Sequence, residues 1–262
     1  MTGALIVGVA TSDIRPLATY ALRLGDDALI LGQRLGEWCG HAPILEIDLS
    51  LTNVALDLIG QATHLLGLAG EVEGKGRDAD ALAFKRDALD FTNCLLVEQP
   101  NGDFAQTIAR QFLFSTYQEL LYEGLRASRE PRLAAIATKA LKEVSYHARL
   151  AGEWVARLGD GTDESRARMV HGLDWMWRFA DELFEMDEVE RALVGQGLAT
   201  DKEALRLAWD GRIASTLTEA GLTSPAPRRA VVGGRRGNHT EHLGHLLSEM
   251  QFLQRAYPGA TW

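Results

Sequence analysis

The chain has 262 residues, of which 46% are hydrophobic and 24% charged, which is the composition of an ordinary globular protein. This length can bury a substantial core within one large domain. The formal charge of −9 argues against nonspecific binding to nucleic acid, because such binding requires a net basic surface.

The two cysteines, Cys39 and Cys94, form neither a CxxC motif nor a disulfide-rich pattern, so we expect a cytoplasmic protein. An apolar run over residues 4–10 is too short to span a bilayer, and charged residues follow it. We therefore predict a flexible extension over residues 1–16, a single helical domain over residues 17–262, and no membrane segment.

Apolar residues recur at helical spacing through most of the chain, whereas no segment has the alternation of a strand. Pro16 and Pro131 suit the first turn of a helix, and Asp103 suits a helix cap. Short loops favour antiparallel neighbours, so the pattern predicts an all-α fold. Helices are expected over residues 17–38, from the corner at 43 to about 69, and over 82–97, 103–128, 131–158, 164–184, 201–219 and 238–257.

The helix that follows Pro43 carries a polar ladder, Asn53, Asp57, Gln61 and His64, beside its apolar stripe. Ferritin-like bundles bind two irons through Glu and Glu-x-x-His motifs on such helices, because residues three apart project together. No Asp or Glu of this chain is followed by His three residues later, and the nearest match begins with Gln61. The sequence therefore predicts a ferritin-like helix bundle whose di-iron site has been lost.

Four unusual motifs extend this interpretation: QRLGEWCGHAP, LEIDL followed by ALDLIGQA, LLVEQPNGDFA, and HTEHLG near the end. With them, residues 17–262 closely resemble the PaaC family, the C subunits of phenylacetyl-CoA 1,2-epoxidases. The resemblance implies a structural subunit without a cofactor of its own, paired with a homologous catalytic subunit that carries two irons. It also implies that the complex epoxidises phenylacetyl-CoA with O2, using electrons from an NADPH-dependent reductase.

Five residues are candidates for the relic of a metal site. Glu143 precedes His147 by one helical turn, so this pair is either a former metal half-site or a buried histidine bonded to that carboxylate or to a neighbour. The polar ladder is likewise either filler where irons once sat or a partly solvated face. The degenerate metal-site positions are Asp57, Gln61, His64, Glu143 and His147.

A glycine- and arginine-rich loop precedes the last helix, with the sequence GGRRG at residues 233–237. Free backbone N–H groups and the charges of Arg235 and Arg236 suit a CoA phosphate, although an acidic partner or solvent are alternatives. The resemblance also places Asp90, Phe91, Thr92 and Asn93 near the CoA thioester at the subunit interface. An ordinary helix interior with Phe91 in the core is the alternative for these four residues.

The C-terminal histidines, His239, His242 and His245, lie close to Glu241 and Glu249 and form the densest group of potential metal ligands. Their spacing spreads them around the helix, so helix capping or interface packing is the favoured interpretation over zinc binding. Two other functions stay open from the residues alone. The chain could be an independent metalloenzyme, through His147 with Glu143 or through these histidines, or a free-standing acyl-CoA binding protein.

Overall fold

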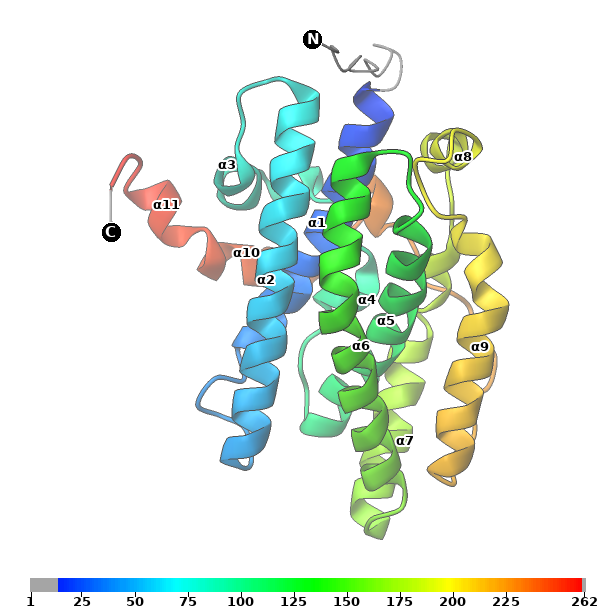
Figure 1. The fold of residues 1–262 in the computed structure, drawn as a ribbon. Coiled ribbons are helices and arrows are strands. Elements are labelled where there is room, and N and C mark those ends of the chain that lie inside the picture. The colour runs from blue at the N-terminus through cyan, green and yellow to red at the C-terminus, as the bar shows by residue number, and fades with distance from the viewer. Residues whose placement is uncertain (1–13, 261–262) are drawn as a thin grey trace.

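The computed structural model describes residues 14–260, and all regular secondary structure within that range is helical (Figure 1). The all-α prediction is therefore confirmed. The long helices are α1 (Ile14–Gly36), α2 (Leu45–Glu73), α5 (Phe104–Leu125), α6 (Pro131–Gly159), α7 (Asp163–Trp177) and α9 (Lys202–Glu219). The shorter elements are α3 (Ala79–Phe84), η1 (Ala88–Asp90), α4 (Leu95–Glu98), η2 (Asp181–Phe184), α8 (Glu188–Gly195), η3 (Gly234–Arg236), α10 (Glu241–Met250) and α11 (Phe252–Ala256).

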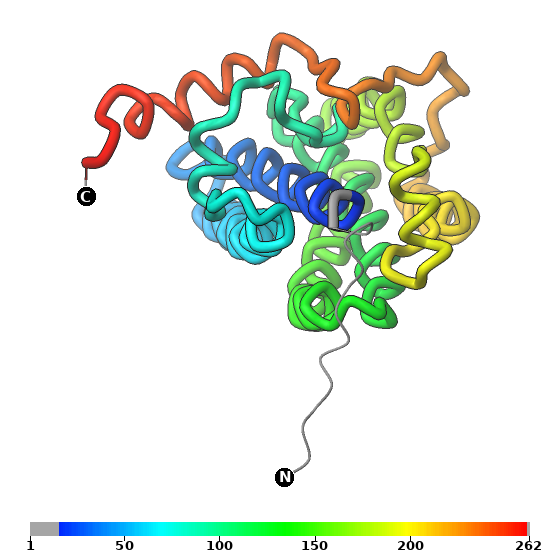
Figure 2. Tube along the Cα trace, turned by 90° about the horizontal axis from the view of Figure 1, so that it is seen from above, coloured from blue at the N-terminus to red at the C-terminus, as the bar shows by residue number. Residues whose placement is uncertain are grey.

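Two helical hairpins form the body of the molecule. Helix α1 packs along α2, α5 packs along α6, and the hairpins meet where α2 contacts α6. Helices α7 and α9 cover the outer side of α5, while α10 and α11 extend away from the bundle (Figures 1 and 2). Because most residues of α1 are buried, this helix lies at the centre of the arrangement. The architecture is consistent with a ferritin-like bundle.

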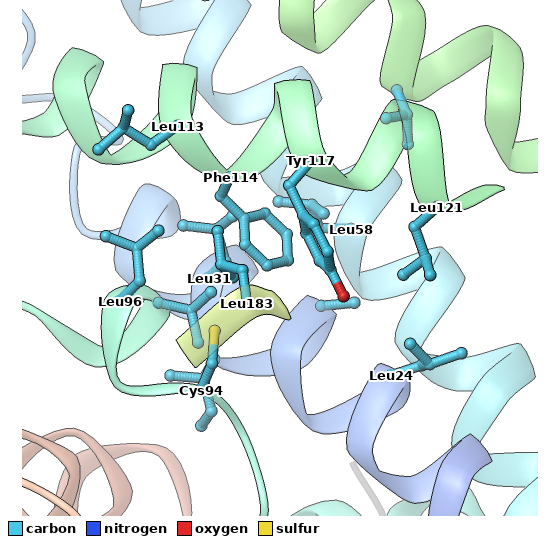
Figure 3. Close-up of a cluster of buried hydrophobic side chains, with 14 of the residues drawn as sticks. Leu24, Leu31, Leu58, Cys94, Leu96, Leu113, Phe114, Tyr117, Leu121 and Leu183 are labelled. Atoms are coloured by element: carbon cyan, nitrogen blue, oxygen red, sulfur yellow. The ribbon is translucent and has the colours of Figure 1, made fainter. Parts of the chain in front are cut away.

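Apolar side chains fill the space where α1, α2 and α5 meet. Figure 3 shows Leu24 and Leu31 of α1, Leu58 of α2, and Phe114 and Tyr117 of α5 within one cluster of buried side chains. All five are buried, and burial of such side chains is the main favourable term in folding. The middle of the bundle is therefore a packed hydrophobic core.

Local signals placed most helix ends correctly. The Asp103 carboxylate accepts a hydrogen bond from the Gln106 N–H at 2.9 Å and caps α5, and Pro131 is the first residue of α6. Helix α1 begins at Ile14, three residues earlier than predicted. The rest of the predicted extension, residues 1–13, lies outside the described residues.

The predicted helix over residues 82–97 is wrong. Its place is taken by α3, η1 and α4, with an extended stretch at residues 91–94. The cause lies in α1, where the Asp26 carboxylate accepts the Thr92 N–H at 2.9 Å and the Asp27 carboxylate accepts the Cys94 N–H at 2.8 Å. These main-chain groups therefore bond to side chains instead of to helical carbonyls, which ends the helix.

Two further predicted helices are interrupted. The helix expected over 164–184 ends at Trp177, and Glu182 of η2 turns inward to accept three main-chain N–H groups. The helix expected over 238–257 begins later and breaks between α10 and α11, where the Gln251 side chain donates to the carbonyls of Ala83 and Arg86. Within residues 14–260, no helix is long and apolar enough to cross a membrane.

Candidate functional site

The five predicted relic positions come together at the seam between α2 and α6. Asp57, Gln61 and His64 project from α2, and Glu143 and His147 project from α6. All of them except His147 line a cavity of about 130 Å³. The helical spacing therefore identified a real cluster, although the sequence did not show which residues bond to one another.

The cluster is held by side-chain hydrogen bonds across the seam. The fully buried His147 has its Nε2 3.0 Å from Oδ2 of Asp57. The Gln61 amide donates to Oε2 of Glu143 at 3.0 Å and accepts from the Gln118 amide of α5 at 3.2 Å. Among the two interpretations of His147, the structure supports a buried histidine bonded to a neighbouring carboxylate, that of Asp57 rather than Glu143.

These residues do not fit a di-iron centre. The Gln61 amide nitrogen, a hydrogen-bond donor, faces Glu143, and the Lys139 ammonium lies 3.4 Å from Nε2 of His64. Iron in such bundles needs converging carboxylates and imidazoles, whereas here the carboxylates bond to an amide and to a histidine. Nowhere in residues 14–260 do three His, Cys, Asp or Glu side chains form a group that could hold a metal ion.

The glycine-rich loop binds the carboxylate of Glu182, a residue of the same chain. The N–H groups of Gly233 and Gly234 each donate to Oε1 of Glu182 at 2.7 Å, and the Leu95 N–H donates to Oε2 at 2.7 Å. Glu182 is fully buried. The predicted anion-binding geometry is therefore present, and Glu182 takes the place that we expected a CoA phosphate to take.

The two arginines of this loop have different surroundings. The buried Arg235 guanidinium pairs with both carboxylate oxygens of Asp27, at 2.7 and 3.0 Å, and also donates to the Thr92 carbonyl. The Arg235 charge is therefore already paired within the chain, and the predicted contact of this residue with CoA stays a prediction. The Arg236 side chain is exposed, 4.0 Å from Glu185, and its predicted contact with CoA stays a prediction.

Residues 90–93 mostly point into the protein. Phe91 is fully buried beneath the Arg86 guanidinium, which lies 4.0 Å from the ring centroid. The Thr92 hydroxyl donates to Asp26 at 3.0 Å, and the buried Asn93 amide donates to Glu98 at 2.8 Å. Phe91 thus lies in the core, as the alternative interpretation held, but the segment is extended and not the helix interior that this interpretation assumed. Of these four residues Asp90 alone is exposed.

The fully buried Glu98 carboxylate organises the start of the C-terminal helices. It accepts hydrogen bonds from the main-chain N–H and the hydroxyl of Thr240 and lies 2.7 Å from Nδ1 of His239. The other ring nitrogen, Nε2, lies 2.8 Å from the Phe91 carbonyl oxygen. Both partners are acceptors, so the ring makes both bonds only as an imidazolium. His239 therefore ties the chain just before α10 to Glu98 and Phe91, whereas the cap residue of α10 is Thr240.

Comparison with known proteins identifies the lineage of this bundle. The family model described as "Phenylacetic acid catabolic protein" matches residues 9–262. The chain belongs to the phenylacetic acid catabolic protein family. It is 52% identical over 246 residues to the C subunit of the 1,2-phenylacetyl-CoA epoxidase of Escherichia coli (strain K12), covering 94% of this chain and 99% of that protein. The resemblance seen in the four motifs is thus confirmed.

In this member of the phenylacetic acid catabolic protein family, sequence reasoning missed four of the buried acids, Asp26, Asp27, Glu98 and Glu182, whose carboxylates bond to the loops. A usable signal was present for three of them. Asp26 and Asp27 interrupt a long apolar stretch of α1, and Glu98 follows the apolar residues 95–97. A buried carboxylate requires hydrogen-bond donors, so an acid within an apolar run indicates a partner elsewhere in the chain.

The His239 anchor gives the protein a pH dependence. Burial of the ring opposes protonation, but the bonds to the Glu98 carboxylate and the Phe91 carbonyl outweigh it and raise the pKa of His239 above 6.5. A pKa that is higher in the folded state means stabilisation that is complete below about 6.5 and lost as the pH rises through the folded pKa.

We therefore expect His239→Gln to lower the free energy of unfolding by about 1.5–3 kcal/mol near pH 6, the range for a hydrogen bond to a charged group. The difference from wild type should shrink toward pH 9, as measured by urea unfolding at several pH values. The exposed His245 provides the control, since His245→Gln should change little at any pH. A deficit for His239→Gln that is independent of pH would contradict a charged ring.

Proposed function

We propose that this chain is the non-catalytic structural subunit of a multi-subunit phenylacetyl-CoA epoxidase that acts in aerobic phenylacetate catabolism. The identity of 52% to the C subunit of such an epoxidase, over nearly the whole chain, supports the complex. The observation that carries the non-catalytic role is the pairing of the Gln61 amide with Glu143 at the relic site. An amide in this position supplies a donor to the carboxylate, and the pair needs no metal charge.

The proposed partners are the di-iron catalytic subunit, which would hold the cofactor of the complex, and the remaining epoxidase subunits. This chain itself would carry no cofactor and would work in the cytoplasm. Its contribution would be to bury a large helical surface against the catalytic subunit and to keep the iron-bearing helices of that subunit in position. Phenylacetyl-CoA would bind at or near the interface, where Arg236 is the most exposed candidate for a contact with a CoA phosphate.

Co-purification tests this proposal. The chain is expressed with and without the other epoxidase subunits, and the mass of the complex and its iron content are measured together. We expect stoichiometric iron only in the complex, in the amount that the catalytic subunit alone accounts for, and no O2-dependent product from the isolated chain. Two irons bound to the isolated chain would overturn the structural role and favour an independent metalloenzyme.

A further inference from the structure

Four arginines from distant parts of the chain line one cavity of about 340 Å³, which we call the arginine cavity. Arg23 belongs to α1 and Arg191 to α8, whereas Arg235 and Arg236 belong to η3. A volume of this size lies within the range of ligand pockets, about 300–1,000 Å³. The remaining lining residues are Glu185, Met186, Asp187, Glu190 and Glu203.

The four arginines lie at two depths. Arg23 and Arg235 form the floor of the cavity, with side chains that are 7% and 8% exposed. Arg191 and Arg236 form its rim, with side chains that are 52% and 62% exposed. Each floor arginine has a buried Nε that finds no hydrogen-bond partner among the described residues. The floor therefore holds donors that the chain itself leaves unbonded.

The two acids nearest the floor are already engaged by cations of the chain. Asp187 accepts a hydrogen bond from Arg23 at 2.5 Å and caps α8, and the bond from Arg23 lowers the pKa of Asp187 to about 2. Glu190 lies 3.3 Å from Arg23 and 2.7 Å from the ammonium of the buried Lys202. Neither carboxylate is therefore available to a cation from outside.

At the rim, one acid is engaged and the other is not. Glu203 accepts from Arg191 at 2.6 Å, whereas Glu185 approaches Arg236 only to 4.0 Å. Within residues 14–260 the Arg236 guanidinium has no closer partner than Glu185. The rim thus presents a guanidinium whose donors are largely unused.

Net charge alone does not select a ligand, because the lining residues and their direct partners are balanced. The cations are Arg23, Arg191, Lys202, Arg235 and Arg236, and the acids are Asp27, Glu185, Asp187, Glu190 and Glu203. Hydrogen-bonding capacity does select one. A guanidinium only donates and a carboxylate only accepts, and here most carboxylates are engaged while several guanidinium donors are not. A ligand rich in acceptors is therefore complementary to the cavity.

We propose that the arginine cavity binds the phosphate group of a small metabolite. A phosphate monoester carries about two negative charges at neutral pH and several strong acceptor oxygens, and arginine is well suited to bind it through paired N–H groups. Arg236 makes the contact at the rim, and the floor arginines supply further donors. The cavity is larger than a phosphate ion, so it also has room for part of the molecule that carries the phosphate. This inference goes beyond the proposed function, because the site needs no other subunit.

Titration of the isolated chain with inorganic phosphate, followed by calorimetry at constant ionic strength, tests the proposal. Arg236→Ser should lower the affinity about tenfold or more, which is the effect of losing a hydrogen bond to a charged group. Glu185→Gln should raise the affinity, because it removes the unengaged acid beside Arg236. The matched control is Arg126→Ser, since Arg126 is an exposed arginine outside the cavity, and it should bind phosphate as the wild type does. All three side chains are substantially exposed, so the variants should keep the wild-type unfolding temperature.

The opposite signs of the two effects distinguish an anion site from a cation site. No binding at millimolar phosphate, or equal affinities of Arg236→Ser and the wild type, would overturn the proposal. Titration with CoA and with CoA lacking its 3′-phosphate identifies the source of the phosphate. Tighter binding of intact CoA would assign its 3′-phosphate to the cavity, whereas equal and weaker binding of both would assign free phosphate. A chain that binds phosphate but joins no epoxidase complex would contradict the proposed function alone.

Discussion

Replacing Glu182 with glutamine should destabilise the protein by about 3 kcal/mol or more, measured as the free energy of unfolding in urea. The Glu182 carboxylate is fully buried and accepts three main-chain N–H groups, from Leu95, Gly233 and Gly234. Glutamine has the same size, but it presents an NH2 group where an acceptor is required. At least one buried donor then faces another donor, and each unpaired buried donor costs about 1–3 kcal/mol, in addition to the lost charge-assisted bonds.

The control for this variant is Glu185→Gln, three residues further along the chain. Its carboxylate is about half exposed and 4.0 Å from Arg236, so its loss should change stability by no more than about 0.5 kcal/mol. If Glu182→Gln unfolds at the wild-type urea concentration, Glu182 does not hold the glycine-rich loop to α4.

The second large effect is expected at Asp26, where alanine should cost about 3–5 kcal/mol. The Asp26 carboxylate is fully buried and pairs with both terminal nitrogens of Arg86, one of them at 3.0 Å. It also accepts from the N–H and the hydroxyl of Thr92. Removing one partner of a buried ion pair leaves an uncompensated charge in the protein interior, which is the main source of this cost.

A double variant separates the two contributions at this site. Asp26→Ala combined with Arg86→Met removes the stranded guanidinium and keeps apolar volume beside Phe91, so it should be more stable than Asp26→Ala alone. Urea unfolding of the four proteins in this cycle gives the coupling energy directly. A double variant no more stable than the single one would mean that the cost comes from the contacts with Thr92.

Helix positions and helix caps could be predicted from neighbouring residues in the sequence, whereas contacts between distant residues could not. The long helices follow from apolar spacing, and the first residue of α6 and the cap of α5 follow from Pro131 and Asp103. The segment at residues 82–97 has the same spacing but does not form one helix, because Asp26, 66 residues before Thr92, captures a main-chain donor. A single sequence pattern carries no signal for such a distant contact.

At the candidate site, too, the positions of residues along each helix were predictable, but their bonding partners were not. Helical spacing correctly placed the candidate residues on two helices, α2 and α6, that face each other. The bond between Asp57 and His147 joins positions 90 residues apart, so it could not be assigned from one helix at a time. For the glycine-rich loop, composition correctly predicted affinity for an anion. Composition could not indicate that Glu182 of the same chain would supply that anion. Glycine N–H groups and arginine side chains attract a carboxylate of the protein and an anionic ligand alike.

The pairing of Asp27 with Arg235 has a consequence for how the protein is made. The ribosome releases the N-terminus first, and Arg235 follows Asp27 by 208 residues. At synthesis rates of about 5–20 residues per second, the Asp27 carboxylate waits about 10–40 s for its cation. During this interval α1 and α2 can pair, but α1 still presents an unneutralised acid on a surface that must later be buried. Neutralisation of this acid in the central helix is thus tied to residue 235, so a nascent chain that ends before Arg235 leaves the buried Asp27 carboxylate without its cation.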